Sequence, residues 1–406
     1  MHQKRRPFLL VWAAAVSAVT LLLGVLAAAA HAQASPATPL ACEDGDQPGG
    51  ARYRICLPAF GWNGDLVVYA HGYVSPYEPV GIPEEQLSIG GVALADVITL
   101  QGYAFAASSY RRNGLSMLEG VEDLVELVEV FSARHGAPDR VILTGVSEGG
   151  AITVLAVERH PEVFDGGLAL CGPYGSFQRQ VDYFTDFRVI FDYYFPGLIE
   201  GTPISITGQL TSTWQTGFYS TTVQPAILSP ANALTVAQVI SVTGAPVDAS
   251  AFPTSTEPTF SRLLWYNILS TNDARQQLGG NPFGNVTRPY TGSLDDVALN
   301  LGVFRVAAEP AAVATIAQQY EPSGVLRVPL ITMHTTGDEI TPYWHAALYQ
   351  QRIDAAGSGA LYEHRAVERF GHCNFTLAEV QSAFSVIVER ANARALYLPA
   401  ILDEAP

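Results

Sequence analysis

Residues 145–150, Gly-Val-Ser-Glu-Gly-Gly, stand between a short apolar run and a helical pattern. A Gly-x-Ser-x-Gly pattern at such a junction is typical of a nucleophile elbow, a sharp and strained strand-to-helix turn. Only small residues fit two positions before and two positions after the serine, and Gly145 and Gly149 meet that requirement. Five residues alone recur by chance, but here a strand and a helix stand on the correct sides. The pattern predicts that Ser147 projects at the carboxyl edge of a sheet.

Short apolar runs alternate with helical patterns along most of the chain. Runs rich in Val, Ile, Leu and Tyr predict strands, and apolar residues spaced three and four apart predict helices. Buried strands alternating with helices are typical of an α/β protein with a mostly parallel sheet. The predicted strands are 51–58, 65–70, 103–109, 140–145, 167–171, 328–334 and 361–367, and the predicted helices are 86–101, 116–135, 149–160, 343–356 and 376–395.

The segment 173–323 does not follow this alternation. It opens with an aromatic cluster at 177–195, continues through a Thr- and Ser-rich tract at 202–222, and contains two further helical stretches. We expect a mainly helical insertion at one edge of the sheet, with most of its aromatic residues packing its own core. The chain then divides into one α/β domain, 33–172 with 324–406, and the insertion.

Two polar residues follow late strands in the order that a nucleophile elbow requires. Asp338 stands on the turn after strand 328–334, and His372 stands between the last strand and the last helix. Serine, acid and histidine in this chain order form a catalytic triad. The histidine, oriented by the carboxylate, takes the serine proton as the serine attacks a carbonyl carbon. The pattern predicts Ser147 as nucleophile, His372 as base and Asp338 as its orienting acid.

Two of these assignments have rivals. Glu339 is an alternative to Asp338, but the position directly after a glycine favours Asp338. His345 and His364 are alternatives to His372. The first falls inside a predicted helix and the second inside a predicted strand, where a structural role is commoner.

Backbone N–H groups near the serine are expected to stabilise an oxyanion. Strand 65–70 runs into His71-Gly72-Tyr73, a turn that suits a backbone donor, and Glu148 directly follows the serine. We expect the N–H groups of Tyr73 and Glu148 to form an oxyanion hole, whose removal typically costs about 10²–10³ in rate. His71 is expected to order the turn rather than to take part in catalysis.

These motifs resemble those of the α/β-hydrolase superfamily of serine hydrolases, over about residues 51–172 and 324–395. The resemblance implies an α/β-hydrolase fold: an eight-stranded, mostly parallel sheet flanked by helices, with a large lid after the sixth strand, where 173–323 falls. It also implies the triad named above. The motifs that carry the resemblance are His71-Gly72, residues 145–150, Gly337-Asp338 and Gly371-His372. Two further local segments are similar to tannase-like, feruloyl-esterase-like and prolyl-oligopeptidase-like members: Ser108-Ser109-Tyr110-Arg111 and Asp165-Gly166-Gly167.

The four cysteines are expected to form two disulfides. Cys42 and Cys56 flank a Gly-rich turn, which predicts a bridge across a small N-terminal hairpin. The tannase and feruloyl esterase group places one cysteine directly before the nucleophile, bridged to another directly after the histidine. This chain has Cys373 after the histidine but Val146 before the serine, which departs from that group. We predict instead a Cys171–Cys373 bridge that ties the histidine loop to a neighbouring strand end.

The N-terminus has the features of an export signal. Lys4, Arg5 and Arg6 precede an uncharged apolar run at 8–30, followed by the cleavage candidates Ala-His-Ala and Ala-Gln-Ala. This predicts a cleaved signal at 1–32, using the general or the twin-arginine route, and a secreted or periplasmic protein without stable membrane association after cleavage. The alternative is an uncleaved anchor, because a run of this length spans a bilayer. Export also favours disulfides.

Composition excludes several classes of function. The chain has 22 Lys and Arg against 38 Asp and Glu, a net charge of −16. Nucleic acid is therefore not an expected partner, because a phosphate backbone is bound mainly by Lys and Arg. Lys4 is the only lysine, which excludes Schiff-base and P-loop chemistry. The acidic residues lack ligand-like spacing, so we expect no metal, and nothing in the sequence indicates a cofactor.

Together the patterns predict a secreted serine hydrolase that cleaves a small-molecule carboxylic ester through an acyl-enzyme, with activity falling as the histidine becomes protonated. The aromatic insertion favours a small or medium apolar or aromatic acyl group, with Phe184 and Phe187 as candidate contacts. Arg111, just past a strand, is a candidate for a substrate carboxylate, or for ion pairs with the insertion. The alternatives are a serine exopeptidase of the prolyl-oligopeptidase or tripeptidyl-aminopeptidase type, a lipid or polyester esterase, and a non-catalytic binding protein. Substrate identity and oligomeric state do not follow from the sequence.

Overall fold

The computed structural model describes residues 41–402 except Pro253. The predicted signal at 1–32 lies outside the described residues. Within the described ranges no single helix is long and apolar enough to cross a bilayer, although the bent pair Gly208–Leu228 and Pro230–Thr243 meets the criteria of length and composition.

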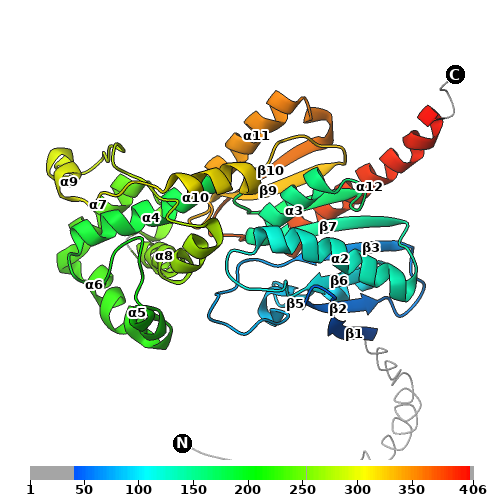
Figure 1. Ribbon diagram of the computed structural model, residues 1–406, viewed down its shortest axis with the longest axis horizontal. Coiled ribbons are helices and arrows are strands. Elements are labelled where there is room, and N and C mark those ends of the chain that lie inside the picture. The colour runs from blue at the N-terminus through cyan, green and yellow to red at the C-terminus, as the bar shows by residue number, and fades with distance from the viewer. Residues whose placement is uncertain (1–40, 253, 403–406) are drawn as a thin grey trace, which may run out of the picture. The chain divides into compact units, whose positions relative to one another are not determined.

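A sheet of eight strands forms one side of the described part of the chain, in the spatial order β1-β2-β6-β3-β7-β8-β9-β10 (Figure 1). β2 pairs antiparallel with β1 and β6, and the other pairs in this sheet are parallel. The carboxyl ends of the parallel strands therefore share one edge. The strands are β1 (Ala41–Asp46), β2 (Arg52–Leu57), β3 (Asp65–Ala70), β6 (Ala104–Ser108), β7 (Arg140–Val146), β8 (Gly166–Leu170), β9 (Leu330–Gly337) and β10 (Tyr362–Phe370).

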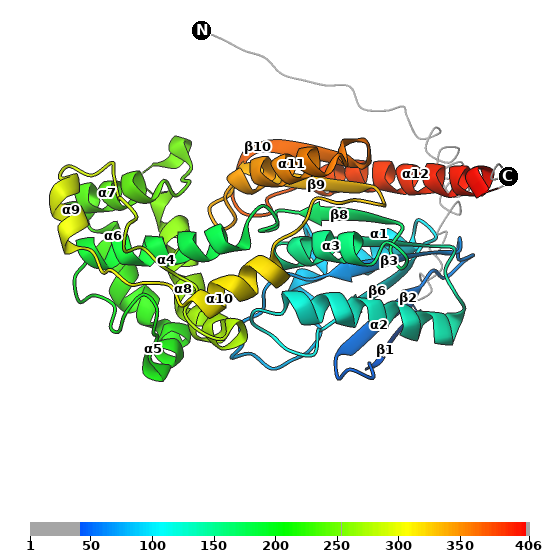
Figure 2. The same ribbon diagram turned by 45° about the horizontal axis from the view of Figure 1, so that its top comes forward.

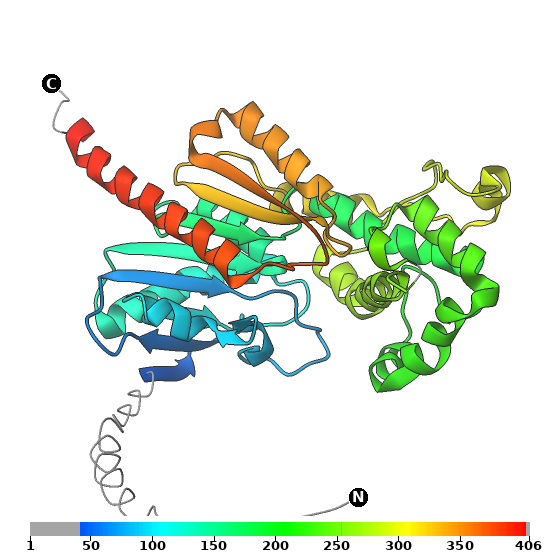
Figure 3. The same cartoon turned by 180° about the vertical axis from the view of Figure 1, so that it is seen from behind.

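Each face of the sheet packs on its own core. In β3, Leu66 and Val68 belong to one core and Val67 to the other. Side chains alternate between the faces, so a strand buried on both reads as one continuous apolar run. Helices α2 (Met117–His135), α3 (Glu148–Arg159) and α11 (Trp344–Ala356) contribute to the first core. Helices α1 (Leu94–Thr99) and α12 (Leu377–Leu402) contribute to the second, on the face seen in Figure 3.

The insertion, residues 173–323, begins after β8, the sixth strand of the sheet along the chain, and ends before β9. Its helices lie together beside the sheet (Figure 2). Most of them enclose a separate hydrophobic core that includes Phe187, Phe191 and Phe260, so the expected internal packing of the aromatic cluster is present; Ala312, Ile316 and Tyr320 near the end of the insertion belong to the first core of the sheet. The helices are α4 (Phe177–Tyr194), α5 (Gly208–Thr213), α6 (Gln224–Leu228), α7 (Ala233–Thr243), α8 (Thr256–Leu278), α9 (Asp296–Gly302) and α10 (Pro310–Thr315), with π-helical turns at Trp214–Val223 and Ile316–Tyr320.

The predicted helix at 86–101 is wrong. A 3₁₀ turn at Glu84–Gln86, a small hairpin of β4 (Ser88–Ile89) and β5 (Val92–Ala93), and the short helix α1 take its place. Gly90 and Gly91 form the hairpin turn with φ of 58° and 80°, a conformation open to glycine and costly for other residues. This pair of glycines interrupts what otherwise reads as one helical spacing.

Candidate active site

The turn between β7 and α3 places Ser147 at the carboxyl edge of the sheet. Its φ and ψ are 56° and −123°, in the strained left-handed half of backbone space. A Cβ added to Gly145 would lie 2.2 Å from the carbonyl oxygen of Gly149, and one added to Gly149 would lie 2.1 Å from that of Ala70. Backbone atoms thus exclude any side chain at both positions, as the motif predicted.

A chain of hydrogen bonds joins the three predicted triad residues. The Ser147 Oγ lies 2.9 Å from His372 Nε2, and His372 Nδ1 lies 2.8 Å and 3.0 Å from the two carboxylate oxygens of Asp338. A carboxylate only accepts, so Nδ1 carries the proton and donates it, which leaves Nε2 to accept from the serine hydroxyl. This is the tautomer that a general base needs.

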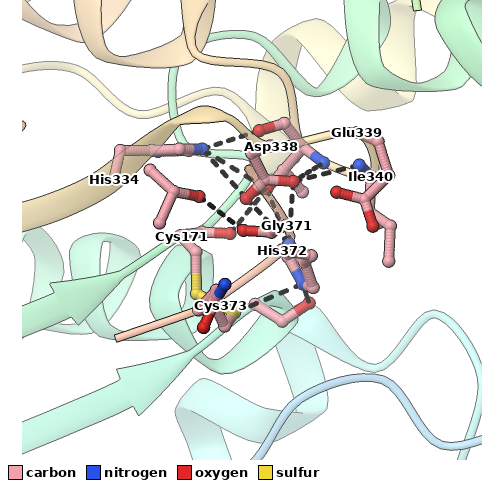
Figure 4. A network of polar contacts seen from close by, with 12 residues as sticks. Cys171, His334, Asp338, Glu339, Ile340, Gly371, His372 and Cys373 are labelled. Carbon is pink, nitrogen blue, oxygen red and sulfur yellow. Dashed lines mark hydrogen bonds and ion pairs between the residues drawn. A yellow bond between two sulfur atoms is a disulfide. The ribbon is translucent and has the colours of Figure 1, made fainter. Parts of the chain in front are cut away.

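Asp338 is fully buried and surrounded by donors (Figure 4). The N–H groups of Ile340 and Thr341 donate to its Oδ1 at 3.0 Å and 2.8 Å, and His334 Nε2 lies 3.5 Å from Oδ2. Burial alone would raise the pKa of Asp338, but the charge of His372 and the bonds from His334 and His372 outweigh it and lower the pKa. The group therefore stays a carboxylate and holds the imidazole in place. Sequence reasoning missed His334, whose only signal is its position at the end of a predicted strand.

The Cys171–Cys373 disulfide is present beside this network, and so is the Cys42–Cys56 disulfide across the β1–β2 hairpin. Cys373 Sγ lies 3.3 Å from His372 Nε2 (Figure 4). Cys171, His372 and Cys373 are close enough together to form a candidate metal cluster in the described part of the chain. Both sulfurs are already bonded to one another, so the cluster offers no thiolate ligand.

The turn after β3 passes directly over the nucleophile. A Cβ added to Gly72 would lie 3.1 Å from Ser147 Cβ. The Gln86 side chain holds the turn, because its Oε1 accepts from the Gly72 N–H at 2.7 Å and its Nε2 donates to the Tyr73 carbonyl at 3.3 Å. Tyr73 and Glu148 both line the pocket next to Ser147, where an oxyanion hole is required. No sequence signal pointed to Gln86.

His71 has the geometry of a structural residue. Burial lowers its pKa to about 4, and its ring stacks on Tyr110 with centroids 4.0 Å apart. Its Nδ1 lies 2.7 Å from the carbonyl oxygen of Gly72. A neutral ring fixed in this way orders the turn, in agreement with the sequence interpretation.

An apolar pocket of about 80 Å³ opens beside Ser147. Pockets for drug-sized ligands measure about 300–1,000 Å³, so this one takes a small group. The ring of Phe184 in α4 stacks on that of Tyr266 in α8, with centroids 4.8 Å apart and an angle of 4° between planes. Tyr266 lines this pocket together with Ser147. The insertion thus contributes residues to the immediate surroundings of the nucleophile.

Of the three candidate substrate contacts, Phe184 alone lines this pocket. The prediction that Phe187 contacts the substrate is wrong, because this residue is fully buried in the core of the insertion against Phe260. The candidate role of Arg111 in binding a substrate carboxylate is also wrong. Asp123 binds the Arg111 guanidinium at 2.5 Å and 2.7 Å, and Arg111 does not line the pocket. Both predictions failed because of packing. Phe187 lies on the side of α4 that faces the core of the insertion, and Arg111 pairs with a nearby buried carboxylate.

The rival residues lie elsewhere. His345 is buried, its Nδ1 accepts from the Gly175 N–H at 3.0 Å, and burial lowers its pKa well below the usual value. Burial also lowers the pKa of His364 to about 4, and its Nδ1 lies 2.9 Å from the Thr332 hydroxyl. Glu339 forms an ion pair with Arg262. None of these contacts involves the serine.

The chain is similar to several hydrolases. Residues 94–222, which include Ser147, match the family model described as serine aminopeptidase, S33. An o-phthalyl amidase of Xanthobacter agilis is 25% identical over 86% of each chain. Among solved structures, feruloyl esterase B from Aspergillus oryzae (15% identity, TM-score 0.48) aligns over 82% of this chain and 73% of its own. The Pyrococcus horikoshii acylaminoacyl peptidase (12%, TM-score 0.41) also aligns over 82% of this chain, which spans 38% of the peptidase.

The strand order, the strained serine between β7 and α3, and the match to a serine hydrolase family model all agree. The chain has the α/β-hydrolase fold and is a serine hydrolase of that type.

Proposed function

We propose that this chain is an exported esterase that cleaves carboxylic esters through an acyl-enzyme on Ser147. The observation that carries the proposal is the hydrogen-bonded chain from Ser147 through His372 to Asp338, beside an apolar pocket. The two disulfides support export, because such bonds persist in oxidising compartments. Cleavage of residues 1–32 during export is part of the proposal.

In the proposed reaction, His372 Nε2 takes the hydroxyl proton as Ser147 Oγ attacks the ester carbonyl. The N–H groups of Tyr73 and Glu148 stabilise the negative oxygen of the tetrahedral intermediate. The imidazolium, held by Asp338, then gives its proton to the departing alcohol. Water then attacks the acyl-enzyme while His372 takes its proton. The imidazolium returns that proton to Ser147 Oγ as the acid is released.

The pocket beside the serine fits the acyl group of the ester. Its size favours a short chain or a single ring, and most of its lining residues are apolar or aromatic. A second cleft of about 590 Å³ shares Tyr73 with this pocket and extends between the 73–86 loop and Trp265 of α8. We assign the leaving alcohol to that cleft, because it meets the pocket at the residue proposed for the oxyanion hole.

The insertion is proposed to act as a lid. Phe184 and Tyr266 come from its helices α4 and α8 and lie beside the nucleophile. An ion pair of 2.5 Å between Arg112, after β6, and Asp273 in α8 fastens α8 to the α/β domain. A lid that covers the pocket in this way limits access for a polymer.

Amide hydrolysis is the second candidate. It is favoured by the similarity over 86% of each chain to a protein named as an amidase, and by the aminopeptidase description of the matching family model. The same triad serves both reactions, since an amine replaces the alcohol as leaving group. An exopeptidase would further need a carboxylate for the substrate amine.

The test compares nitrophenyl esters with anilides of the same acyl groups on the mature protein. We expect ester turnover, modification of Ser147 by a fluorophosphonate probe located by mass spectrometry, and loss of both in Ser147→Ala. Ser385→Ala, on the exposed face of α12, is the matched control and should retain both. Folded protein that the probe leaves unmodified would overturn the catalytic proposal, and anilides cleaved as fast as esters would favour the amidase. N-terminal sequencing of the exported protein tests removal of 1–32.

A further inference from the structure

The Glu148 side chain is a buried carboxyl in the pocket next to the nucleophile. It is 7% exposed and lines the pocket together with Ser147. Its Oε1 accepts from the Ser116 N–H at 3.0 Å. Its Oε2 is buried and has no hydrogen-bond partner. Burying a polar atom without a partner destabilises the folded state, so this atom indicates a site where a ligand supplies the partner.

We propose that the Glu148 carboxyl donates a hydrogen bond from Oε2 to an uncharged oxygen on the acyl group of the substrate. The inference rests on the proposed function and narrows its substrate class. The favoured acyl groups carry an ether or carbonyl oxygen close to the scissile carbonyl, in place of a plain hydrocarbon chain. Glu148 then has two separate roles, because its backbone N–H belongs to the proposed oxyanion hole and its side chain selects the acyl group.

A donor role requires the carboxyl to be protonated at neutral pH. Burial raises the pKa of Glu148 to about 8 despite the bond from Ser116, and the charges of Asp273 and Glu119 act in the same direction. Arg112 opposes them, but it is already paired with both carboxylates. The neighbouring tyrosines stay neutral because burial raises the pKa of each: they are Tyr73, Tyr110, Tyr266 and Tyr320.

The rest of the lining argues against a charged ligand group. An ammonium brings three donors and a carboxylate needs several, whereas three other polar side chains of the pocket, those of Gln180, Thr341 and Ser270, already form hydrogen bonds within the protein. Gln180 donates to the Ile340 carbonyl at 2.8 Å and its Oε1 lies 2.8 Å from a ring nitrogen of His345. The hydroxyls of Thr341 and Ser270 donate to backbone carbonyls at 2.7 Å and 2.6 Å. The single proton on the Glu148 carboxyl suits a ligand group with one acceptor.

The experiment uses pairs of nitrophenyl esters that differ by one CH₂ replaced with an ether oxygen: butanoate against methoxyacetate, and pentanoate against 3-methoxypropanoate. An aminopropanoyl ester is the charged comparison. For each enzyme the measured quantity is the ratio of kcat/KM for the ether ester to that for the alkyl ester. A substitution that alters the catalytic base changes kcat/KM for both esters alike, so its effect cancels in this ratio. The difference in intrinsic reactivity between the two esters is the same for every enzyme, so it cancels when the ratios are compared between variants.

The wild-type ratio should exceed that of Glu148→Leu by about five- to tenfold for at least one pair, the value of one neutral hydrogen bond. Glu148→Gln should keep most of it, because an amide N–H₂ also donates. The wild-type ratio should fall as the pH rises through about 8, since an ionised carboxyl cannot donate, and the Gln ratio should not. Glu129→Gln, on the exposed face of α2, is the control and should match the wild type.

Equal ratios in wild type, Leu and Gln variants would overturn the inference while leaving the esterase proposal intact. Preference for the aminopropanoyl ester that Glu148→Gln abolishes would also overturn it, in favour of an ionised site for a substrate amine. If the folded wild type neither cleaves any ester nor reacts with the fluorophosphonate probe, the proposed function fails and this inference fails with it.

Discussion

Removing the Cys171–Cys373 disulfide should cost both stability and activity, whereas removing Cys42–Cys56 should cost stability alone. A disulfide destabilises the unfolded chain by limiting its entropy, and the effect grows with the length of the closed loop. The two bridges join residues 202 and 14 positions apart. The loop-entropy relation then gives about 5 kcal/mol for the first and about 3 kcal/mol for the second.

The effect on activity depends on where each bridge lies. Cys373 directly follows His372, and the Cys171 N–H donates to the Met333 carbonyl at 2.8 Å in β9, the strand that leads to the acid. Without this bridge the histidine loop is free to shift, and a misplacement of about 1 Å costs up to about 10² in rate. The other bridge joins β1 and β2, which β6 and β3 separate from β7.

We therefore expect kcat/KM to fall about tenfold to a hundredfold in the Cys171→Ser/Cys373→Ser variant and less than about twofold in Cys42→Ser/Cys56→Ser. Urea unfolding gives the loss of stability, and ester hydrolysis is measured at a temperature at which both variants are folded. Equal losses of activity in the two variants would refute the reasoning. So would mass mapping of the unreduced protein that joins Cys42 to Cys171 or to Cys373.

Three further substitutions test the site. Asp338→Asn should lower kcat by about 10⁴, as loss of the orienting carboxylate does in other triads, with circular dichroism confirming the fold. Tyr266→Phe keeps the stacking on Phe184 but removes a polar hydroxyl from a residue that lines the pocket beside Ser147; kcat/KM should fall about three- to tenfold without a change in Tm. Burial raises the pKa of Glu148 to about 8, so the folded state holds a proton that the unfolded state releases near pH 4.3. The free energy of unfolding should therefore fall between about pH 5 and 8, by up to about 1.4 kcal/mol per pH unit. Glu148→Gln should lack this part of the slope in urea unfolding; a parallel slope would contradict the buried, protonated carboxyl.

The features predicted correctly from sequence share a local signal. The elbow needs only five residues with a strand before and a helix after, and the backbone contacts of Gly145 and Gly149 explain why those positions are glycine. The acid and the histidine follow strands, and strand ends converge at one edge in any parallel sheet. Chain order alone was therefore enough to bring Asp338 and His372 to Ser147.

The features that sequence reasoning missed depend on contacts between distant segments. Tyr266 lines the pocket beside the nucleophile only because α8 folds back toward the sheet edge, and no periodicity encodes that path. Gln86 supports the turn after β3 from a segment that the pattern assigned to a helix. Phe187 and Phe184 lie three positions apart on α4, yet one packs in the core of the insertion and the other lines the pocket. Spacing alone does not distinguish these two sides of an aromatic helix.

The insertion contacts the loop of the catalytic acid as well as the pocket. From α4, the side chain of Gln180 donates to the Ile340 carbonyl at 2.8 Å. The Tyr183 hydroxyl donates to the Glu339 carbonyl, also at 2.8 Å. Both acceptors lie within two residues of Asp338, and the Ile340 N–H itself donates to that carboxylate. A displacement of α4 would therefore move the acid that orients the base, so exchange of the insertion for another should change the rate with every substrate unless residues 338–342 are exchanged with it.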